Sequence, residues 1–357
     1  MTLAVPNPST AAAGAKQTAT TWNTDVRDAI NYLLALQGGL GRRNFLKNPR
    51  MDLWQRGTSF AIPASTKTYT ADRWVAYRAA TGSTVSRQTG PTGQSYGLRY
   101  QRDPGNTSTA TMRIIQALPT TNSLPMAGQV VSLRINLAAG ANFSPAGGTV
   151  SLIVTTGTGT DQDPVTTWTG TADALSITQA VTTGSTDYVF DNVIIPANTN
   201  QVKVEASWVP VGTAGANDWC QLNAVQVSAG SMAGFEQIPP EQNLAECQAF
   251  YYQWGPWGAA NLLALGQAAS TTACLVTYPL PVPMRKVPAV SVSAGNDFMV
   301  TSVTTTAVTD YTPYGRLSTD VVHLIFTVAS GLTVGTIYAL NNSADTTNAA
   351  IYFDAEL

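Results

Sequence analysis

The stretch QVVSLRINLA (129–138) alternates apolar and polar residues along its length. Successive side chains of a β-strand point to opposite faces, so this alternation predicts a strand with one buried face and one polar face. The pattern recurs between residues 44 and 235, with Pro and Gly clusters typical of turns between TVSLIVTT (149–156), YVFDNVII (188–195), NQVKVEASWV (200–209) and CQLNAVQVSA (220–229). Many short strands of this kind predict an antiparallel β-sandwich of the jelly-roll type.

A helix-like stretch then interrupts the β pattern. PPEQNLAECQAFYYQ (239–253) begins with two prolines and a glutamate, which are typical of a helix start. Strand patterns return in ACLVTYPL (273–280) and VHLIFTVAS (322–330). The chain is therefore expected to be mainly β, with an N-terminal arm (1–21), a short helix (22–40), a first sandwich (41–238), a helical connector (239–253) and a second, smaller sandwich (254–357).

The predicted N-terminal helix carries one apolar stripe, formed by Trp22, Val26, Ile30 and Leu33. A helix of this length is marginal alone in water, so the stripe needs a surface to cover it. That surface is either the chain's own β domain or two further copies of the helix around a threefold axis, and the second alternative predicts a homotrimer. The Ala/Thr/Pro-rich arm before the helix is expected to lie on a partner, so residues 1–37 are predicted to be an attachment segment.

Composition excludes several classes of function. Charged residues make up 11% of the chain, the net charge is −2, and no run of Lys or Arg exceeds two residues, so no nucleic-acid binding is expected. No stretch of 18 apolar residues is present, so no membrane insertion is expected. The three cysteines, Cys220, Cys247 and Cys274, have neither disulfide-framework nor zinc-site spacing and are predicted to be buried thiols. Such thiols fit folding in a reducing cytoplasm.

The sequence also argues against catalysis. His323 is the only histidine and lies in a predicted strand, so a Ser-His-Asp or Cys-His arrangement would depend on it alone. No nucleotide-binding or nucleophile-elbow motif is present. The remaining design is a pair of carboxylates, as in glycoside hydrolysis, with candidates among the turn residues Asp161, Asp163, Asp187 and Asp191. We therefore expect no enzyme, no cofactor and no metal ion.

Aromatic side chains suggest binding instead. Exposed aromatic faces flanked by polar groups suit sugars, and the candidates are Trp168, Trp208 and Trp219 in the first sandwich and Tyr311 and Tyr314 in the second. The two tyrosines lie in TDYTPYGRLSTD (309–320), which reads as a long exposed loop. Trp254 and Trp257 either join this set or pack at the domain junction or trimer axis.

Several motifs resemble one known group of proteins. The motifs are NFLKNPRMDLWQRGTSF (44–60), YTADRWVAY (69–77), AVQVSAGSMAGFEQIPPEQNLAECQAFYYQW (224–254), PMRKVPAV (283–290) and FDAEL (353–357). Together they resemble a module of bacteriophage tail-fibre and minor virion structural proteins, which is itself similar to a carbohydrate-binding-module jelly roll. WNTDVRDAINYLL (22–34) resembles a segment found near the start of phage virion proteins.

The resemblance implies a structural role for its motif residues, above all Trp54, Arg56, Asp72 and Trp74. Each tryptophan ring N–H needs a partner when buried. Arg56 with Asp72, or Asp52 with Arg73, is a candidate charge pair between the two segments. Carbohydrate-binding relatives often hold calcium near this corner through an acid in the last strand, where this chain has Asn223, so calcium is doubtful.

The function implied is that of a non-enzymatic virion structural protein, folded in the host cytoplasm. As a trimeric tail fibre, it would attach to a tail, baseplate, collar or capsid protein through residues 1–37 and present its sandwiches to host-surface polysaccharide. The alternative is a purely structural head fibre, capsid decoration or collar protein, and a third reading is a polysaccharide depolymerase.

Overall fold

The computed structural model describes residues 26, 44–230, 232, 234–256, 262–315, 317–343 and 349–357. The predicted arm and trimerising helix, with Trp22, Ile30 and Leu33, lie outside these residues, and so does Trp257. Val26 is described alone and is helical and half-buried. The N-terminal attachment and trimerisation therefore stay predictions.

The described chain forms two compact units. Unit 1 holds Ser59–Thr68 and Trp74–Gln237 together with the chain up to Asp52. Unit 2 holds Ile238–Leu357 and also two short segments from earlier in the sequence, Leu53–Thr58 and Tyr69–Arg73. Most of unit 2 therefore lies after Gln237, and two short stretches from earlier in the chain complete it.

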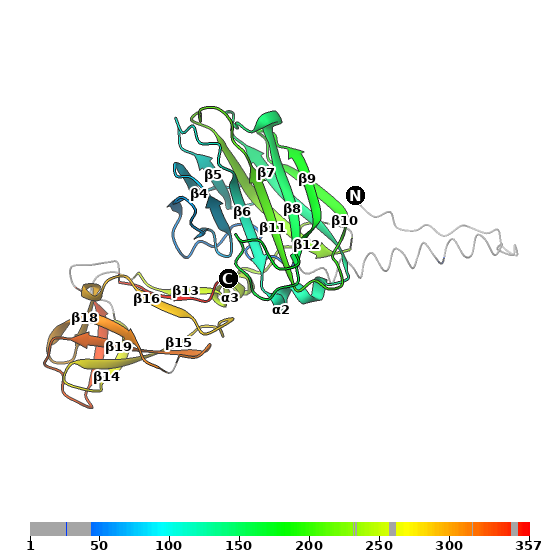
Figure 1. Cartoon of the computed structure of the whole chain (residues 1–357). Helices are drawn as coiled ribbons and strands as arrows, with labels where there is room; N and C mark the ends of the chain where they lie inside the picture. Colours follow the sequence, from blue (N-terminus) through cyan, green and yellow to red (C-terminus); the bar gives the residue numbers. More distant parts are fainter. Residues whose placement is uncertain are drawn as a thin grey trace, which may run out of the picture. The chain divides into compact units, whose positions relative to one another are not determined.

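Unit 1 is a sandwich of two six-stranded sheets whose neighbouring strands run antiparallel (Figure 1). The sheet that we call the β12 sheet has the order β1 (Ser59–Ala61), β4 (Ser83–Thr89), β5 (Tyr96–Arg102), β12 (Trp219–Ala229), β7 (Val130–Ala139) and β10 (Thr186–Ile194). The β11 sheet has the order β2 (Thr68–Tyr69), β3 (Val75–Arg78), β6 (Met112–Leu118), β11 (Gln201–Trp208), β8 (Thr149–Gly157) and β9 (Ala172–Ala180). Short helical turns lie at α2 (Thr120–Ser123), η1 (Leu124–Met126) and η2 (Ala146–Gly148).

Alternation along the strands builds the core of unit 1. Leu133, Ile135 and Leu137 of β7 are fully buried, while Arg134 and Asn136 between them remain partly exposed. The chain that enters unit 1 is also buried: Gln116 of β6 accepts from the Lys47 backbone N–H at 2.7 Å and donates to the Lys47 carbonyl at 2.8 Å. A side-chain amide thus satisfies both polar groups of a buried peptide.

One end of the unit 1 core is closed by a buried ion pair. Arg102 is fully buried, and its Nε donates to Asp218 Oδ2 at 2.8 Å. Its terminal nitrogens donate to the carbonyls of Gly212 and Val211 at 2.9 and 3.1 Å, and Asp218 also accepts from the hydroxyl of Ser144. A buried charge of this kind is tolerated because its partner and the surrounding carbonyls satisfy it.

Unit 2 contains a closed barrel and a three-stranded sheet (Figure 1). The barrel order is β14 (Leu262–Ala268), β15 (Ala273–Pro279), β19 (Val321–Val328), β18 (Thr305–Pro313), β17 (Phe298–Thr301) and β20 (Ile337–Asn342). The sheet has the order β13 (Tyr251–Trp254), β21 (Ile351–Asp354) and β16 (Ala289–Val292), and the helices are α3 (Pro240–Gln248) and η3 (Gly295–Asp297). The mainly β, antiparallel fold class is confirmed, with one difference: the main sheet of the second domain closes on itself, which removes its exposed edges.

Residues from the five motif stretches between 44 and 357 meet in unit 2, in a group that we call the motif cluster: Gln55, Arg56, Tyr69, Asp72, Arg73, Phe250, Tyr251, Arg285, Lys286, Asp354 and Glu356. Arg73 pairs with Glu356, and its guanidinium lies 3.6 Å from the Phe250 ring centre. Arg56 lies 3.5 Å from the Tyr251 ring centre and pairs with Asp354 at 3.3 Å.

Backbone contacts complete the motif cluster. Arg285 Nε and Lys286 Nζ donate to the carbonyls of Ala355 and Glu356 at 2.9 and 2.7 Å, which holds the FDAEL segment in place. Asp72 accepts from the backbone N–H and the side-chain amide of Gln55 at 2.9 and 2.7 Å. Burial raises the pKa of Asp72, against the lowering effects of these hydrogen bonds and of Arg56 and Arg73.

Arg56 and Arg73 form ion pairs with Asp354 and Glu356, from the far end of the chain. Arg56 and Asp72, one of the pairs expected from the sequence, also interact, because burial raises the pKa of Asp72 and the charge of Arg56 lowers it. Arg73 acts on Asp72 in the same way, whereas Asp52 lies 4.0 Å from Arg50. The expected ring partner is present for Trp74, whose Nε1 donates to the Asn48 carbonyl at 3.0 Å, and Trp54 is 9% exposed.

The three cysteines are free and buried, as predicted. In the part of the chain that the structure describes, no helix is long and apolar enough to cross a membrane.

Candidate functional site

The outward face of the β12 sheet carries a continuous set of hydrogen-bonded polar side chains. Gln221 of β12 is its centre: its Oε1 accepts from Arg99 Nη2 at 3.0 Å, and its Nε2 donates to Asn223 Oδ1 at 2.8 Å. Asn223 Nδ2 then donates to Asn136 Oδ1 of β7 at 2.8 Å. We call this group the polar network: Arg99, Gln221, Asn223, Asn136, Ser185, Asp187 and Arg134.

The network ends at β10 with a carboxylate. Asp187 accepts from Asn136 Nδ2 at 2.9 Å and forms an ion pair with Arg134. The network therefore crosses β5, β12, β7 and β10, about 14 Å at the usual strand spacing. This is the span of a short stretch of polymer rather than of one small molecule.

A β-bulge shapes the middle of the network. The pairing of β12 with β7 shifts between Leu222 and Ala224. A bulge places consecutive residues on one side of a strand. Here Asn223 joins the network and Ala224 lines the neighbouring groove.

Beside the network lies a groove of about 170 Å³, lined by Arg50, Pro91, Thr92, Gly93, Gln94, Arg134, Asn136, Asp187, Ala224, Phe235 and Gln237. Gln94 fixes one wall, because its Nε2 donates to the Arg50 carbonyl at 3.0 Å and to the Asn223 carbonyl. Phe235 and Pro91 give apolar surface, while the arginines and Asp187 give polar contacts. The lining is therefore mainly polar, with apolar surface from Pro91, Ala224 and Phe235.

The surroundings of Asp187 favour its ionised form. Partial burial raises the pKa of Asp187, but the hydrogen bonds from Arg134 and Asn136 outweigh it, and the pKa lies below its ordinary value of 3.8. Its contribution to stability is therefore present above this value and is lost as the pH falls through the lowered pKa. The guanidinium of Arg99 lies 3.8 Å from the ring centre of Trp219, which fixes it as a flat surface on the sheet.

Of the aromatic residues predicted from the sequence, Trp219 lies at this site. Trp168 and Trp208 are each 3% exposed, so the expectation that they contact a glycan is wrong. Trp208 packs edge-on against Tyr100 and Phe143 inside the sandwich. Trp208 lies in β11 and contributes apolar area to the core, whereas Trp168 lies in the loop between β8 and β9.

Trp168 instead fastens a loop onto the β11 sheet. Its Nε1 donates to the Asp163 carbonyl at 2.9 Å, and Lys203 lies 4.8 Å from its ring centre and donates to the Pro164 carbonyl at 3.2 Å. A hollow of about 440 Å³ lies at this loop. Arg113 and Glu205 in its lining pair with each other at 2.7 Å, so its charged groups are engaged by the chain itself.

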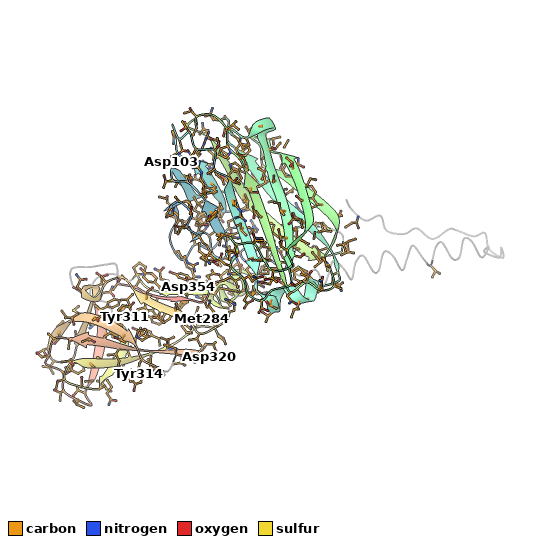
Figure 2. All side chains as sticks on the ribbon, viewed as in Figure 1. Asp103, Met284, Tyr311, Tyr314, Asp320 and Asp354 are labelled. Carbon is orange, nitrogen blue, oxygen red and sulfur yellow. The ribbon has the colours of Figure 1, made fainter. Side chains whose placement is uncertain are left out.

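The two tyrosines of unit 2 differ in their setting. Thr305–Pro313 forms β18, in which Tyr311 pairs with Phe326 and packs against the barrel core, so the predicted exposed loop is wrong up to Pro313. Tyr314 follows the strand and is 44% exposed. Figure 2 labels both on unit 2. Trp254 packs edge-on against Tyr252 and Tyr278 within unit 2; its expected place at the domain junction or trimer axis stays a prediction.

The four candidate acids have separate structural partners. Asp163 pairs with Lys67 at 2.6 Å, Asp187 with Arg134, and Asp191 accepts from the Ser132 hydroxyl at 2.6 Å. Asp161 accepts from the Thr120 backbone N–H. His323 lies in β19, where its Nδ1 is 2.9 Å from the Thr277 hydroxyl. Asn223, at the suspected calcium position, is an amide link within the polar network.

The residues that the sequence left unassigned are Arg99, Gln221, Asn136, Arg134 and Arg50. The alternation in QVVSLRINLA marked Arg134 and Asn136 as outward-facing. Which outward faces lie side by side depends on the strand order, and β5, β12 and β7 are neighbours although far apart in sequence. The sequence signal for this site is therefore a set of strands in which the alternating polar positions hold Asn, Gln and Arg rather than Thr and Ser.

Gly97 offers a test of how tightly the polar network is packed. A Cβ at this position would lie 2.5 Å from Asn223 Oδ1 and 2.7 Å from Gln221 Nε2. Gly97→Ala is expected to force the two amides apart and to lower the free energy of unfolding by about 1–3 kcal/mol. Urea denaturation measures this change. The control is Gly184→Ala, which meets no atom within 4 Å; equal stability of the two variants would contradict tight packing.

Comparisons with known proteins add likenesses in structure only. No protein-family model matches the chain, and no curated protein matches its sequence. A carbohydrate-binding module of family 61, solved with β-1,4-galactotriose, is 13% identical with a TM-score of 0.31, covering 52% of this chain and 97% of that one. A family 22 module of Clostridium thermocellum is 12% identical (TM-score 0.31; 48% and 99% covered).

The enzymatically active domain of tailspike protein 4 of bacteriophage CBA120 is 8% identical, with a TM-score of 0.30, covering 52% of this chain and 21% of that one. TM-scores near 0.3 reflect a loose likeness and say nothing about what this chain binds.

Proposed function

We propose that this chain is a non-enzymatic glycan-binding protein whose site is the outward face of the β12 sheet. The observation that carries the proposal is the polar network. Guanidinium, amide and carboxylate groups are held side by side over four strands, next to a groove with apolar surface. Sugars offer hydroxyls that both donate and accept, and they offer apolar C–H faces, so a surface of this kind is complementary to them.

The rigidity of the network supports recognition. Amides that are fixed by neighbouring amides lose little conformational entropy when they bind a ligand. The arginines keep donors for a ligand, since Arg99 Nη1 and Arg134 Nη1 have no protein partner among the residues that the structure describes. A face built only for stability would not need guanidinium groups that point N–H donors to water.

The test is a double variant, Asn136→Ala with Gln221→Ala, screened against host-surface polysaccharides. Gln221 is 5% exposed and its amide holds Arg99 in place. The variant is therefore expected to weaken glycan binding about tenfold, or roughly 1.4 kcal/mol, by releasing the side chains that the network positions. The control is Gln179→Ala on β9, whose amide bonds only the Ala180 carbonyl. Unchanged binding by the double variant, with binding intact in the control, would place the glycan site elsewhere.

We further propose that the chain is a virion structural protein, a trimeric fibre attached through residues 1–37. The resembling motifs support this, because the cluster that they form in unit 2 accounts for them as one structural module. Exposed apolar side chains on the barrel support self-association, since such patches are typical of protein interfaces: Leu262, Leu265, Val334 and Ile337 are each at least 60% exposed.

The molar mass of the full chain in solution tests the trimer, and the position of the labelled protein on the virion tests the fibre. Attachment at the capsid lattice would favour the purely structural head-fibre or decoration role over a tail fibre. A monomer at all concentrations would contradict the trimer.

A further inference from the structure

We propose that the groove of the β12 sheet prefers carboxylated polysaccharides, of the uronate type, over neutral ones, an inference that rests on the proposed function. The first observation is the balance of charge. Arg50 and Arg134 line the groove, where Asp187 is the carboxylate of the lining; Arg50 also lies 4.0 Å from Asp52 beside the groove. Arg99 lies on the same face, so three guanidinium groups stand against two carboxylates. The chain as a whole carries −2, so this face is locally opposite in sign to the protein.

The second observation is the state of the arginines. Asp187 engages one terminal nitrogen of Arg134, and Gly93 engages one of Arg50 through its carbonyl. The other donors of both side chains have no protein hydrogen-bond partner among the described residues, and neither guanidinium has a nitrogen that is buried without a partner. Side chains of Arg50 and Arg134 are 20% and 23% exposed, so their donors reach water while their stems are held.

A guanidinium that is fixed on one side and open on the other is the usual partner of a carboxylate, because two parallel N–H groups match its two oxygens. Three arginines along one face match a polymer that repeats its charge, whereas a neutral sugar would leave most of these donors bonded only to water. Asp187 limits which ligands fit the groove. Its carboxylate repels a ligand carboxylate placed next to it and accepts hydrogen bonds from ligand hydroxyls. The expected ligand therefore carries carboxylates at intervals, with hydroxyls between them.

The experiment uses the full chain and three acidic probes, polygalacturonate, alginate and hyaluronan, each beside its carboxyl-reduced form. Calorimetry at low and high salt measures binding. At least one acidic probe is expected to bind about tenfold more tightly than its reduced form, with a difference that shrinks in high salt. Arg134→Gln and Arg50→Gln are each expected to remove most of this difference, measured as the ratio of the affinities for the acidic and the reduced probe in the same variant.

Two further variants separate charge from structure. Arg87→Gln removes a positive charge whose guanidinium stacks on Tyr96, away from the groove, and is expected to keep the preference. Asp187→Asn removes the negative charge of the groove lining and is expected to bind the acidic probe at least as tightly as the parent chain.

Equal binding of acidic and reduced probes, with loss in the Asn136→Ala and Gln221→Ala double variant, would overturn the preference and leave the proposed glycan site intact. Absence of binding to all three acidic probes would overturn the preference as well. Loss of acidic binding in Arg87→Gln equal to that in Arg134→Gln would show that net charge, and not this groove, sets the affinity.

Discussion

Replacing Arg102 with methionine is expected to lower the free energy of unfolding of unit 1 by about 3–5 kcal/mol. Arg102 is fully buried, and Asp218, its partner at 2.8 Å, is 2% exposed. Methionine fills part of the space but leaves the Asp218 charge buried without its counter-ion. The carbonyls of Val211 and Gly212 lose their donors as well. Urea denaturation, with hydrogen exchange of β5 and β12 to identify the unit, measures the loss.

The matched control is Arg87→Met on the adjacent strand β4. Arg87 stacks on the Tyr96 ring at 4.3 Å and is half-buried, so its replacement is expected to cost less than about 1 kcal/mol. If Arg102→Met lowered the free energy of unfolding by less than about 1 kcal/mol, the Asp218 carboxylate would have to be hydrated once its partner is removed. The ion pair would then not close this end of the core.

The strand pattern of unit 1 was predictable because one face of each strand is buried and the other is not. QVVSLRINLA shows this rule in full: Leu133, Ile135 and Leu137 face the core. The alternation also marked Arg134 and Asn136 as outward. It could not show that Asn136 meets Asn223, because that contact depends on the pairing of β7 with β12 and on the bulge at Leu222.

Composition misled the prediction where polar residues lie in a closed barrel. Residues 309–313 have a turn-like composition, yet Tyr311 pairs with Phe326 in the barrel sheet. Hydrogen bonds to β19 stabilise this stretch, and local propensity is outweighed by tertiary pairing. The same limit applies to Trp168 and Trp208, whose burial follows from neighbours that are distant in sequence.

The resembling motifs and the candidate site are mostly different parts of the chain. The polar network comes entirely from residues 99–223, which the motif stretches do not include. Motif residues instead form the motif cluster in unit 2. The residues that belong both to a motif stretch and to the candidate site, such as Arg50 and Phe235, line the groove. The motif residues therefore account for the framework of unit 2, and they leave the polar network of the proposed glycan site to residues outside the motif stretches.

The motif cluster itself makes the second large prediction. Glu356→Ala is expected to lower the free energy of unfolding of unit 2 by about 3–5 kcal/mol. The Glu356 side chain is 3% exposed and pairs with Arg73, which is 1% exposed, so the variant leaves a nearly fully buried guanidinium without its carboxylate. Stacking on Phe250 cannot replace that charge, because a cation–π contact contributes only about 1–2 kcal/mol.

Asp354→Ala is the matched control, because it removes a carboxylate two residues away in the same segment. Asp354 is 44% exposed and meets Arg56 at 3.3 Å, and an exposed pair contributes about 1 kcal/mol or less. Hydrogen exchange of β13, β16 and β21 under urea distinguishes the two variants. Equal losses would mean that burial does not decide the strength of these pairs. A large loss of stability in Glu356→Ala alone would show that unit 2 needs the segment Tyr69–Arg73, which supplies Arg73. Most of the sequence of this unit lies much later, in Ile238–Leu357.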